Sequence, residues 1–206
     1  FGSDVEGRDD SLWPAPGAPE GAIARAMDKA AEPDFHMLNQ YENEANFEAH
    51  INTTGPEIWR QTDGRITHFV ASMGTCGTIT GNGRYLKAKN PDIQIIGVHP
   101  EEGHDIPGVR SIRQLQQTKL FHPEEYDQLV SVSNAEAFEM CQRLNREECV
   151  IAGPSSGLAL AGMLKAIQEQ LDAVVVVMFP DNVFKYASSL EKPFPHVRVA
   201  RVGGTE

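Results

Sequence analysis

The chain has 206 residues, of which 40% are hydrophobic and 23% charged, enough to bury one core and part of a second domain. Asp and Glu outnumber Lys and Arg by 29 to 18, and the formal net charge of −11 opposes binding to a nucleic-acid backbone. The longest apolar run, residues 173–180, is far shorter than the roughly 20 residues of a membrane-spanning helix, so we expect a soluble protein without membrane partners.

The segment before the first predicted strand is irregular. Residues 11–19 contain three prolines and indicate a loop, whereas residues 21–31 show a helical pattern. We place a domain boundary near residues 40–46. The last residues, 193–206, indicate an edge strand or a loose tail.

From about residue 66 onward, short apolar runs alternate with helical patterns, which predicts a parallel twisted α/β sheet with helices on both faces. The expected elements are strands at 66–73, 93–98, 128–132 and 173–179, and helices from the glycine loop to about residue 89, at 135–147 and at 158–171. Ser133 and Asn134 are good N-caps for the second of these helices. The run 173–179 is apolar throughout, so we expect a strand buried on both faces at the centre of the sheet.

The cysteines and histidines give no metal or disulfide pattern. Cys76, Cys141 and Cys149 are odd in number and form no C-x-x-C pair, which favours a reducing cytoplasm. The seven histidines include no H-E-x-x-H motif, and no metal site is expected. The start at Phe1 lacks both an initiator methionine and a secretory signal, so we expect an internal part of a longer sequence.

The loop Gly74-Thr75-Cys76-Gly77-Thr78 follows a predicted strand and opens a helix. Backbone N–H groups can converge there on an anion, which the helix dipole favours, and the two threonines add hydroxyl donors. A nucleotide-binding P-loop needs a Gly-Lys-Ser/Thr sequence, and a dinucleotide loop needs G-x-G-x-x-G; neither spacing is present. The loop therefore suits a small monophosphate, although from spacing alone a tight turn without a ligand stays equally open.

Five separated motifs, taken in order along the chain, resemble the cysteine synthase family. They are residues 39–46, 53–59, 74–81, 83–86 and 152–157, and the resemblance runs from Phe1 to about Leu190. It implies a fold-type II pyridoxal 5'-phosphate enzyme, usually a homodimer, that forms L-cysteine by β-replacement. The substrates implied are an O-activated serine (O-acetylserine or O-phosphoserine) and a sulfur donor. Cystathionine β-synthase-like and threonine dehydratase-like activities stay open within the same fold family.

The resemblance implies that Gly74, Thr75, Cys76, Gly77 and Thr78 bind the cofactor phosphate. Cys76 stands where the family usually has glycine, and binding is expected to survive provided that Cys76 does not need a positive φ. We interpret Cys76 as a tolerated small residue in preference to a reactive thiol.

Other site residues come from the same resemblance. Ser155 is expected to face the pyridine nitrogen of the cofactor, with helix capping as the alternative role, and Asp181 is expected to orient that end of the site through Ser155 or water. Gln40 matches a glutamine that approaches the cofactor and the substrate carboxylate, with a polar residue at a strand end as the alternative.

The segment 103–112 corresponds to a loop over the active site, where Gly108 and Arg110 are expected to bind substrate. We hypothesise that Arg110 selects O-phosphoserine over O-acetylserine, since a guanidinium group matches phosphate geometry. A solvated helix end, formed with Arg113, is an equally open interpretation of this arginine.

No segment matches the family's Schiff-base lysine or its Ser-Gly-Asn-Thr-Gly substrate loop, and both are expected upstream of Phe1. The lysines present lie at charged, surface-like positions, whereas a Schiff-base lysine must be buried beside the cofactor. We therefore expect no catalytic residue in this chain, with residues 1–45 as a remnant of the small N-terminal domain, 46–192 as the cofactor-phosphate-binding domain and 193–206 as a tail. Two hypotheses follow: part of a complete enzyme, or a non-catalytic phosphate-binding fragment.

Overall fold

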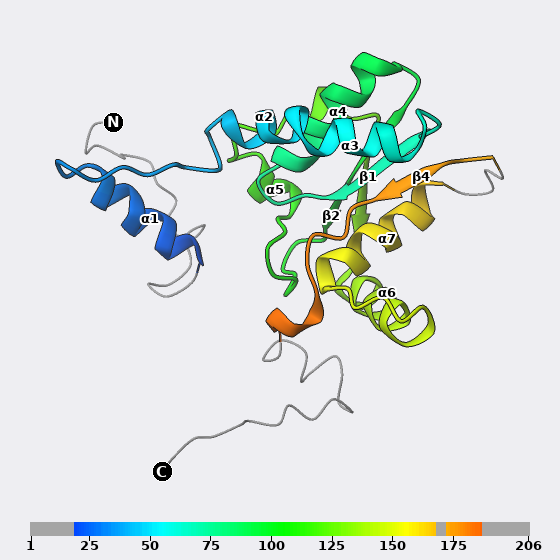
Figure 1. The fold of residues 1–206 in the computed structure, drawn as a ribbon. Helices are drawn as coiled ribbons and strands as arrows, with labels where there is room; N and C mark the ends of the chain where they lie inside the picture. The colour runs from blue at the N-terminus through cyan, green and yellow to red at the C-terminus, as the bar shows by residue number, and fades with distance from the viewer. Residues whose placement is uncertain (1–18, 168–171, 187–206) are drawn as a thin grey trace, which may run out of the picture. The chain divides into compact units, whose positions relative to one another are not determined.

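The computed structural model describes residues 19–167 and 172–186 (Figure 1). The chain divides into two compact units, residues 1–39 and 40–206. In the first unit, Lys29 lies in the last turn of helix α1 (Pro19–Ala30) and forms an ion pair with Glu32, with Nζ and Oε2 2.6 Å apart. No helix in the described ranges has the length and apolarity needed to cross a membrane. The assignment of residues 1–45 to a second, smaller domain stays a prediction.

The second unit is an α/β fold, which confirms the predicted fold class. Helices α2 (Ala45–Asn52) and α3 (Thr54–Gln61) come first, followed by strand β1 (His68–Ser72) and helix α4 (Gly77–Lys89). The remaining elements are β2 (Gln94–Pro100), α5 (Ile112–Leu115), the 3-10 turn η2 (Pro123–Glu125), β3 (Gln128–Val132), α6 (Asn134–Glu147), α7 (Pro154–Ala166), β4 (Val175–Val177) and the 3-10 turn η3 (Val183–Tyr186).

The four described strands form one parallel sheet in the order β3-β2-β1-β4. The prediction that the run 173–179 forms the central strand is wrong for this sheet, because β4 lies at its edge and its valines are only half-buried. An unbroken apolar run reports that both faces of a strand are covered, and it carries no information about the strand's neighbours along the sheet. The centre is instead held by β1 and β2, whose residues Phe69, Val70, Ile95 and Ile96 are fully buried.

Helices cover both faces of the sheet, as Figure 1 shows with α2, α3 and α4 on one side and α6 and α7 on the other. Successive strand residues point to opposite faces, so Phe69 of β1 joins the core beneath α4, whereas Val70 joins the core beneath α7. Since all strands are parallel, their carboxyl ends meet at one edge, and the loops that leave that edge lie close together.

The helix boundaries on the second face partly match the prediction. Ser133 is the N-cap of α6 and forms a capping box with Glu136, whose Oε2 accepts from the Ser133 backbone N–H at 2.9 Å, which confirms the predicted cap. Helix α7 begins at Pro154, four residues before the predicted start, because Gly153 serves as N-cap and a proline suits the first helical position. The predicted continuation to residue 171 enters 168–171, outside the described residues.

Candidate cofactor-phosphate site

The loop 74–78 connects the carboxyl end of β1 with the first turn of α4. Cys76 is the N-cap of α4 and Gly77 its first residue. The first turn of an α-helix has N–H groups without intrahelical acceptors, and they point beyond the helix end together with the positive end of its dipole. A 13-residue helix thus presents its N-terminus to the space beside residues 74–78.

Cys76 has a φ of 67°, in the left-handed region that favours glycine. The sequence analysis expected phosphate binding to survive if Cys76 does not need a positive φ, and that condition is not met. The backbone of the loop nevertheless has the turn that glycine would give, with a cysteine side chain at this position. That side chain is 3% exposed, and burial raises the pKa of its thiol to about 12. A thiol held protonated at neutral pH is a poor nucleophile, which favours the interpretation of Cys76 as a packed small residue.

Both threonines of the loop are hydrogen-bonded to side chains of α2. The Asn46 Nδ2 donates to Thr75 Oγ1 at 3.0 Å and to the Gln40 carbonyl oxygen at 2.6 Å. The His50 Nε2 lies 3.2 Å from Thr78 Oγ1, and its Nδ1 lies 3.0 Å from Thr54 Oγ1. The sequence reasoning did not single out these two α2 residues, although their spacing of four predicts a common helix face.

The segment 103–112 approaches the same loop. The Arg110 backbone N–H donates to the Met73 carbonyl oxygen at 2.9 Å, and a Cβ placed on Gly74 would overlap the carbonyl oxygen of Gly108. Gly108 itself has a φ of 79°, which a glycine adopts without strain. The structure thus brings two of the three predicted substrate residues, Gly108 and Arg110, against the predicted phosphate loop.

The Arg110 guanidinium stacks over the ring of Tyr41, with 4.8 Å between its Cζ and the ring centroid. Arg110 is half-buried, and its side chain is held against Tyr41. This observation disfavours the alternative interpretation, in which Arg110 and Arg113 form a solvated helix end. Gln40 precedes Tyr41 in an exposed turn, so the alternative of a polar residue at a strand end is wrong. The backbone carbonyl of Gln40 accepts a hydrogen bond from Asn46, which also donates to Thr75 of the loop 74–78.

Ser155 lies inside the first turn of α7, buried at 5% exposure, and the N-cap is Gly153; the capping alternative for Ser155 is therefore wrong. Its hydroxyl donates to Asp181 Oδ1 at 3.4 Å, and the Tyr186 hydroxyl donates to Asp181 Oδ2. Asp181 follows β4, so this group also lies at the carboxyl edge of the sheet. Burial, followed by the bond to Asp181, raises the pKa of Tyr186 and keeps its phenol a donor.

The loop 74–78 fits a phosphate group on grounds of its donors. A Cβ on Gly77 would overlap the Asn46 side chain, so a glycine is needed where α2 closes over the turn. Thr75 and Thr78 both receive contacts from α2 on one side and can direct hydroxyl groups to a ligand on the other. The residues present can therefore hold the phosphate of pyridoxal 5'-phosphate without a lysine in the loop.

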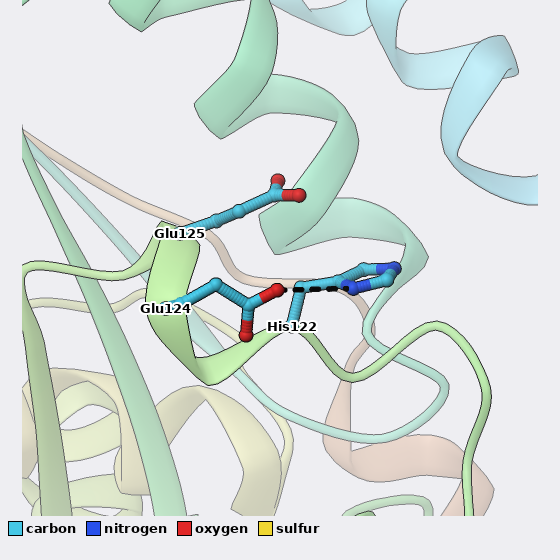
Figure 2. A group of neighbouring side chains, drawn as sticks. All are labelled: His122, Glu124 and Glu125. Carbon is cyan, nitrogen blue, oxygen red and sulfur yellow. Dashed lines mark ion pairs between the residues drawn. The ribbon is translucent and has the colours of Figure 1, made fainter.

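One cluster brings metal-ligand side chains together in the described part of the chain: His122, Glu124 and Glu125. Figure 2 shows the His122 ring beside the Glu124 carboxylate, with Nδ1 and Oε1 3.5 Å apart. Glu125 is bound by Arg84, whose Nε and second guanidinium nitrogen donate to its two oxygens at 2.8 and 2.7 Å. That pair lowers the pKa of Glu125 and uses both oxygens, so the cluster is a surface ion-pair network.

Comparison with known proteins shows the family of the chain. A family model described as "Pyridoxal-phosphate dependent enzyme" matches residues 6–181. Cysteine synthase B of Pseudomonas aeruginosa is 45% identical over 170 residues, which cover 82% of this chain and 57% of that protein. Cysteine synthase B of Escherichia coli is 40% identical over 170 residues, covering 82% of this chain and 56% of that protein.

A solved structure described as O-acetyl serine sulfhydrylase isoform 3 from Entamoeba histolytica superposes with a TM-score of 0.76 at 26% identity, covering 86% of this chain and 56% of that one. The chain spans about half the length of the curated relatives it matches. On the match over residues 6–181, the chain belongs to the pyridoxal-phosphate dependent enzyme family.

Proposed function

We propose that the protein containing this chain forms L-cysteine by pyridoxal-phosphate-dependent β-replacement, from an O-activated serine and a sulfur donor. The observation that carries the proposal is the cation-free loop at the start of α4, with the segment of Gly108 and Arg110 packed against it. The relatives named cysteine synthase support it, since they are 40% and 45% identical over 82% of the chain.

Residues 74–78 would hold the cofactor phosphate through backbone N–H groups and the hydroxyls of Thr75 and Thr78. When bound, the cofactor supplies an electron-withdrawing ring that acidifies the Cα proton of an amino acid and promotes loss of its β-substituent. Ser155 would present a neutral hydroxyl to the ring nitrogen. Its bond to Asp181 is long, at 3.4 Å, so the hydroxyl can exchange this acceptor for a better one.

Arg110 is proposed as the residue that selects O-phosphoserine over O-acetylserine. Its guanidinium is held over Tyr41 at the edge of the phosphate loop, and it can form paired hydrogen bonds with a phosphate or carboxylate. The test compares kcat/KM for both substrates in the full-length protein and its Arg110→Ala variant. Loss of O-phosphoserine turnover with retained O-acetylserine turnover supports this role, and an unchanged preference contradicts it.

The lysine that carries the cofactor is proposed to lie outside this chain. In the described ranges, no lysine is buried: Lys87, Lys119 and Lys165 form ion pairs with Asp127, Glu42 and Glu136. The alternative is a non-catalytic phosphate-binding fragment. Adding pyridoxal 5'-phosphate to the full-length protein and recording the visible absorption of a lysine-linked cofactor separates the two, since the fragment retains phosphate affinity without that band.

The reaction is tested by product analysis of the full-length protein with serine, O-acetylserine and O-phosphoserine, each with sulfide. Formation of cysteine from an O-activated serine supports the proposal. Cystathionine from serine and homocysteine, or an oxo acid from threonine, identifies one of the two alternative activities. A homodimer and a cytoplasmic location are also proposed, and sedimentation and cell fractionation test them.

A further inference from the structure

Helix α2 presents two polar side chains, Asn46 and His50, to the two threonines of the phosphate loop. Residues four apart in a helix share a face, and the close packing of α2 against α4 brings this face to residues 74–78. Gly81 permits that packing, because a Cβ there would overlap the carbonyl oxygen of Phe47 and crowd the His50 side chain. Helix α2 thus forms a second layer behind the loop.

The contacts of Asn46 determine where the Thr75 hydrogen can go. The Gln40 carbonyl, 2.6 Å from Asn46 Nδ2, can only accept, so the amide nitrogen and not the amide oxygen must occupy this side. The same nitrogen therefore donates to Thr75 Oγ1 at 3.0 Å, and the Gly77 backbone N–H donates weakly to the same oxygen at 3.4 Å. Thr75 then accepts twice, and its single hydrogen is left to donate to a ligand.

His50 can act on Thr78 in the same way. Thr53 donates its hydrogen to the Ala49 carbonyl oxygen at 2.6 Å, so it has none for Thr54, whose Oγ1 lies 3.5 Å from its own. Thr54 can then donate either to Thr53 or to His50 Nδ1, and we assign its hydrogen to Nδ1 because that contact is the shorter one, at 3.0 Å. An imidazole that accepts at Nδ1 carries its hydrogen on Nε2 and donates to Thr78 Oγ1, 3.2 Å away. Burial lowers the pKa of His50, which favours the neutral ring that this relay requires.

We propose that Asn46 and His50 are positioning residues that turn Thr75 and Thr78 into donors toward the cofactor phosphate. The inference rests on the phosphate site of the proposed function. It assigns the hydrogen of each hydroxyl: α2 donates to both threonine oxygens, and both threonine hydrogens point to the anion. In the opposite tautomer of His50, Thr78 would donate to Nε2 and lose its hydrogen bond to the phosphate.

The tautomer can be measured directly in the unmodified protein. ¹⁵N imidazole spectra of the full-length protein with pyridoxal 5'-phosphate are recorded at pH 7, and the His50 signals are assigned by their absence in His50→Gln. A protonated Nε2 with an unprotonated Nδ1 is the expected result. A protonated Nδ1 overturns the relay, even if the His50→Ala and Asn46→Asp variants do not fold.

The variants test the effect on binding. His50→Ala removes a donor and Asn46→Asp replaces one by an anion, so each should weaken binding of pyridoxal 5'-phosphate about 10-fold or more, whereas His50→Gln, which keeps a donor near Nε2, should recover most of the affinity. Pyridoxal, which lacks the phosphate, should bind all forms equally. Asn52→Asp is the matched control, because Asn52 is an exposed residue of the same helix.

The outcomes separate this inference from the proposed function. If the unmodified protein binds neither pyridoxal 5'-phosphate nor inorganic phosphate, the phosphate site fails and both proposals fail with it. If it binds both, yet Asn46→Asp and His50→Ala bind as tightly as the unmodified protein, only the inference is overturned. An equal loss of affinity for pyridoxal and pyridoxal 5'-phosphate also overturns it, because that pattern indicates a general structural role.

Discussion

The left-handed backbone of Cys76 makes a quantitative prediction for two substitutions, Cys76→Gly and Cys76→Ala. Both remove the buried sulfur, so the loss of its contacts is common to the pair. At a φ of 67°, alanine retains a strain of about 1–2 kcal/mol that glycine lacks. An opposite effect favours alanine: the greater conformational entropy of glycine in the unfolded chain lowers the stability of the glycine variant by about 0.4–1 kcal/mol. The midpoints of these two ranges leave the glycine variant more stable than the alanine variant by roughly 0.8 kcal/mol.

The assay is urea unfolding of the full-length protein without added cofactor, with the free energy of unfolding compared between the two variants. Cys141 provides the matched control, because it is fully buried and lies inside α6. There alanine should exceed glycine by about 1 kcal/mol, the ordinary helix preference. If alanine is the more stable residue at both positions, the positive φ of Cys76 and the strain assigned to it are refuted.

Two further predictions concern one buried hydrogen bond and one ion pair of the α/β unit. Tyr126→Phe removes a hydroxyl 2.9 Å from Thr80 Oγ1 and should lower the free energy of unfolding by about 1 kcal/mol in thermal denaturation; an unchanged midpoint contradicts this. Glu136 has its pKa lowered from 4.5 to about 2, first by Lys165 and then by Ser133, so its ionised form stabilises the fold above pH 4.5 and this contribution is lost as pH falls toward 2. Glu136→Gln should thus be less stable at pH 7, by under about 1 kcal/mol because the pair is exposed, and this difference should shrink as pH falls from 4.5 toward 2. A difference that keeps its full size from pH 7 to pH 2 contradicts the assignment.

Local signals in the sequence predicted much of the fold. The strand at 128–132 and the Ser133 cap have the predicted positions, since both depend on residues adjacent in the chain. The place of 173–179 in the sheet was wrong because strand order depends on contacts far apart in sequence. The start of α7 was placed too late, although Pro154 after a glycine is a good first helical residue.

In the candidate site, too, the features set by adjacent residues were predicted and those set by contacts distant in sequence were not. The glycine spacing and the strand-to-helix context predicted the position of the loop between β1 and α4, because such a turn depends on adjacent residues, whereas its binding of phosphate stays a prediction. The left-handed φ of Cys76 was missed, since a cysteine gives no signal for it. The contacts of Asn46 and His50 were also missed, because they depend on how closely α2 packs against α4, and that distance is set by Gly77 and Gly81 at positions remote from α2.

The distribution of charge around the loop suggests two separate ways of holding anions. Residues 74–78 contain no lysine or arginine, so a phosphate bound there would depend on short-range hydrogen bonds that salt screens little. Arg110 lies close enough for its charge to oppose the raised pKa of Cys76, and it stacks on Tyr41. If neutral donors hold the cofactor, the charge of Arg110 is not needed for the cofactor phosphate and can serve the proposed selection of O-phosphoserine. Added salt should then raise the KM for O-phosphoserine while leaving the affinity for the cofactor almost unchanged.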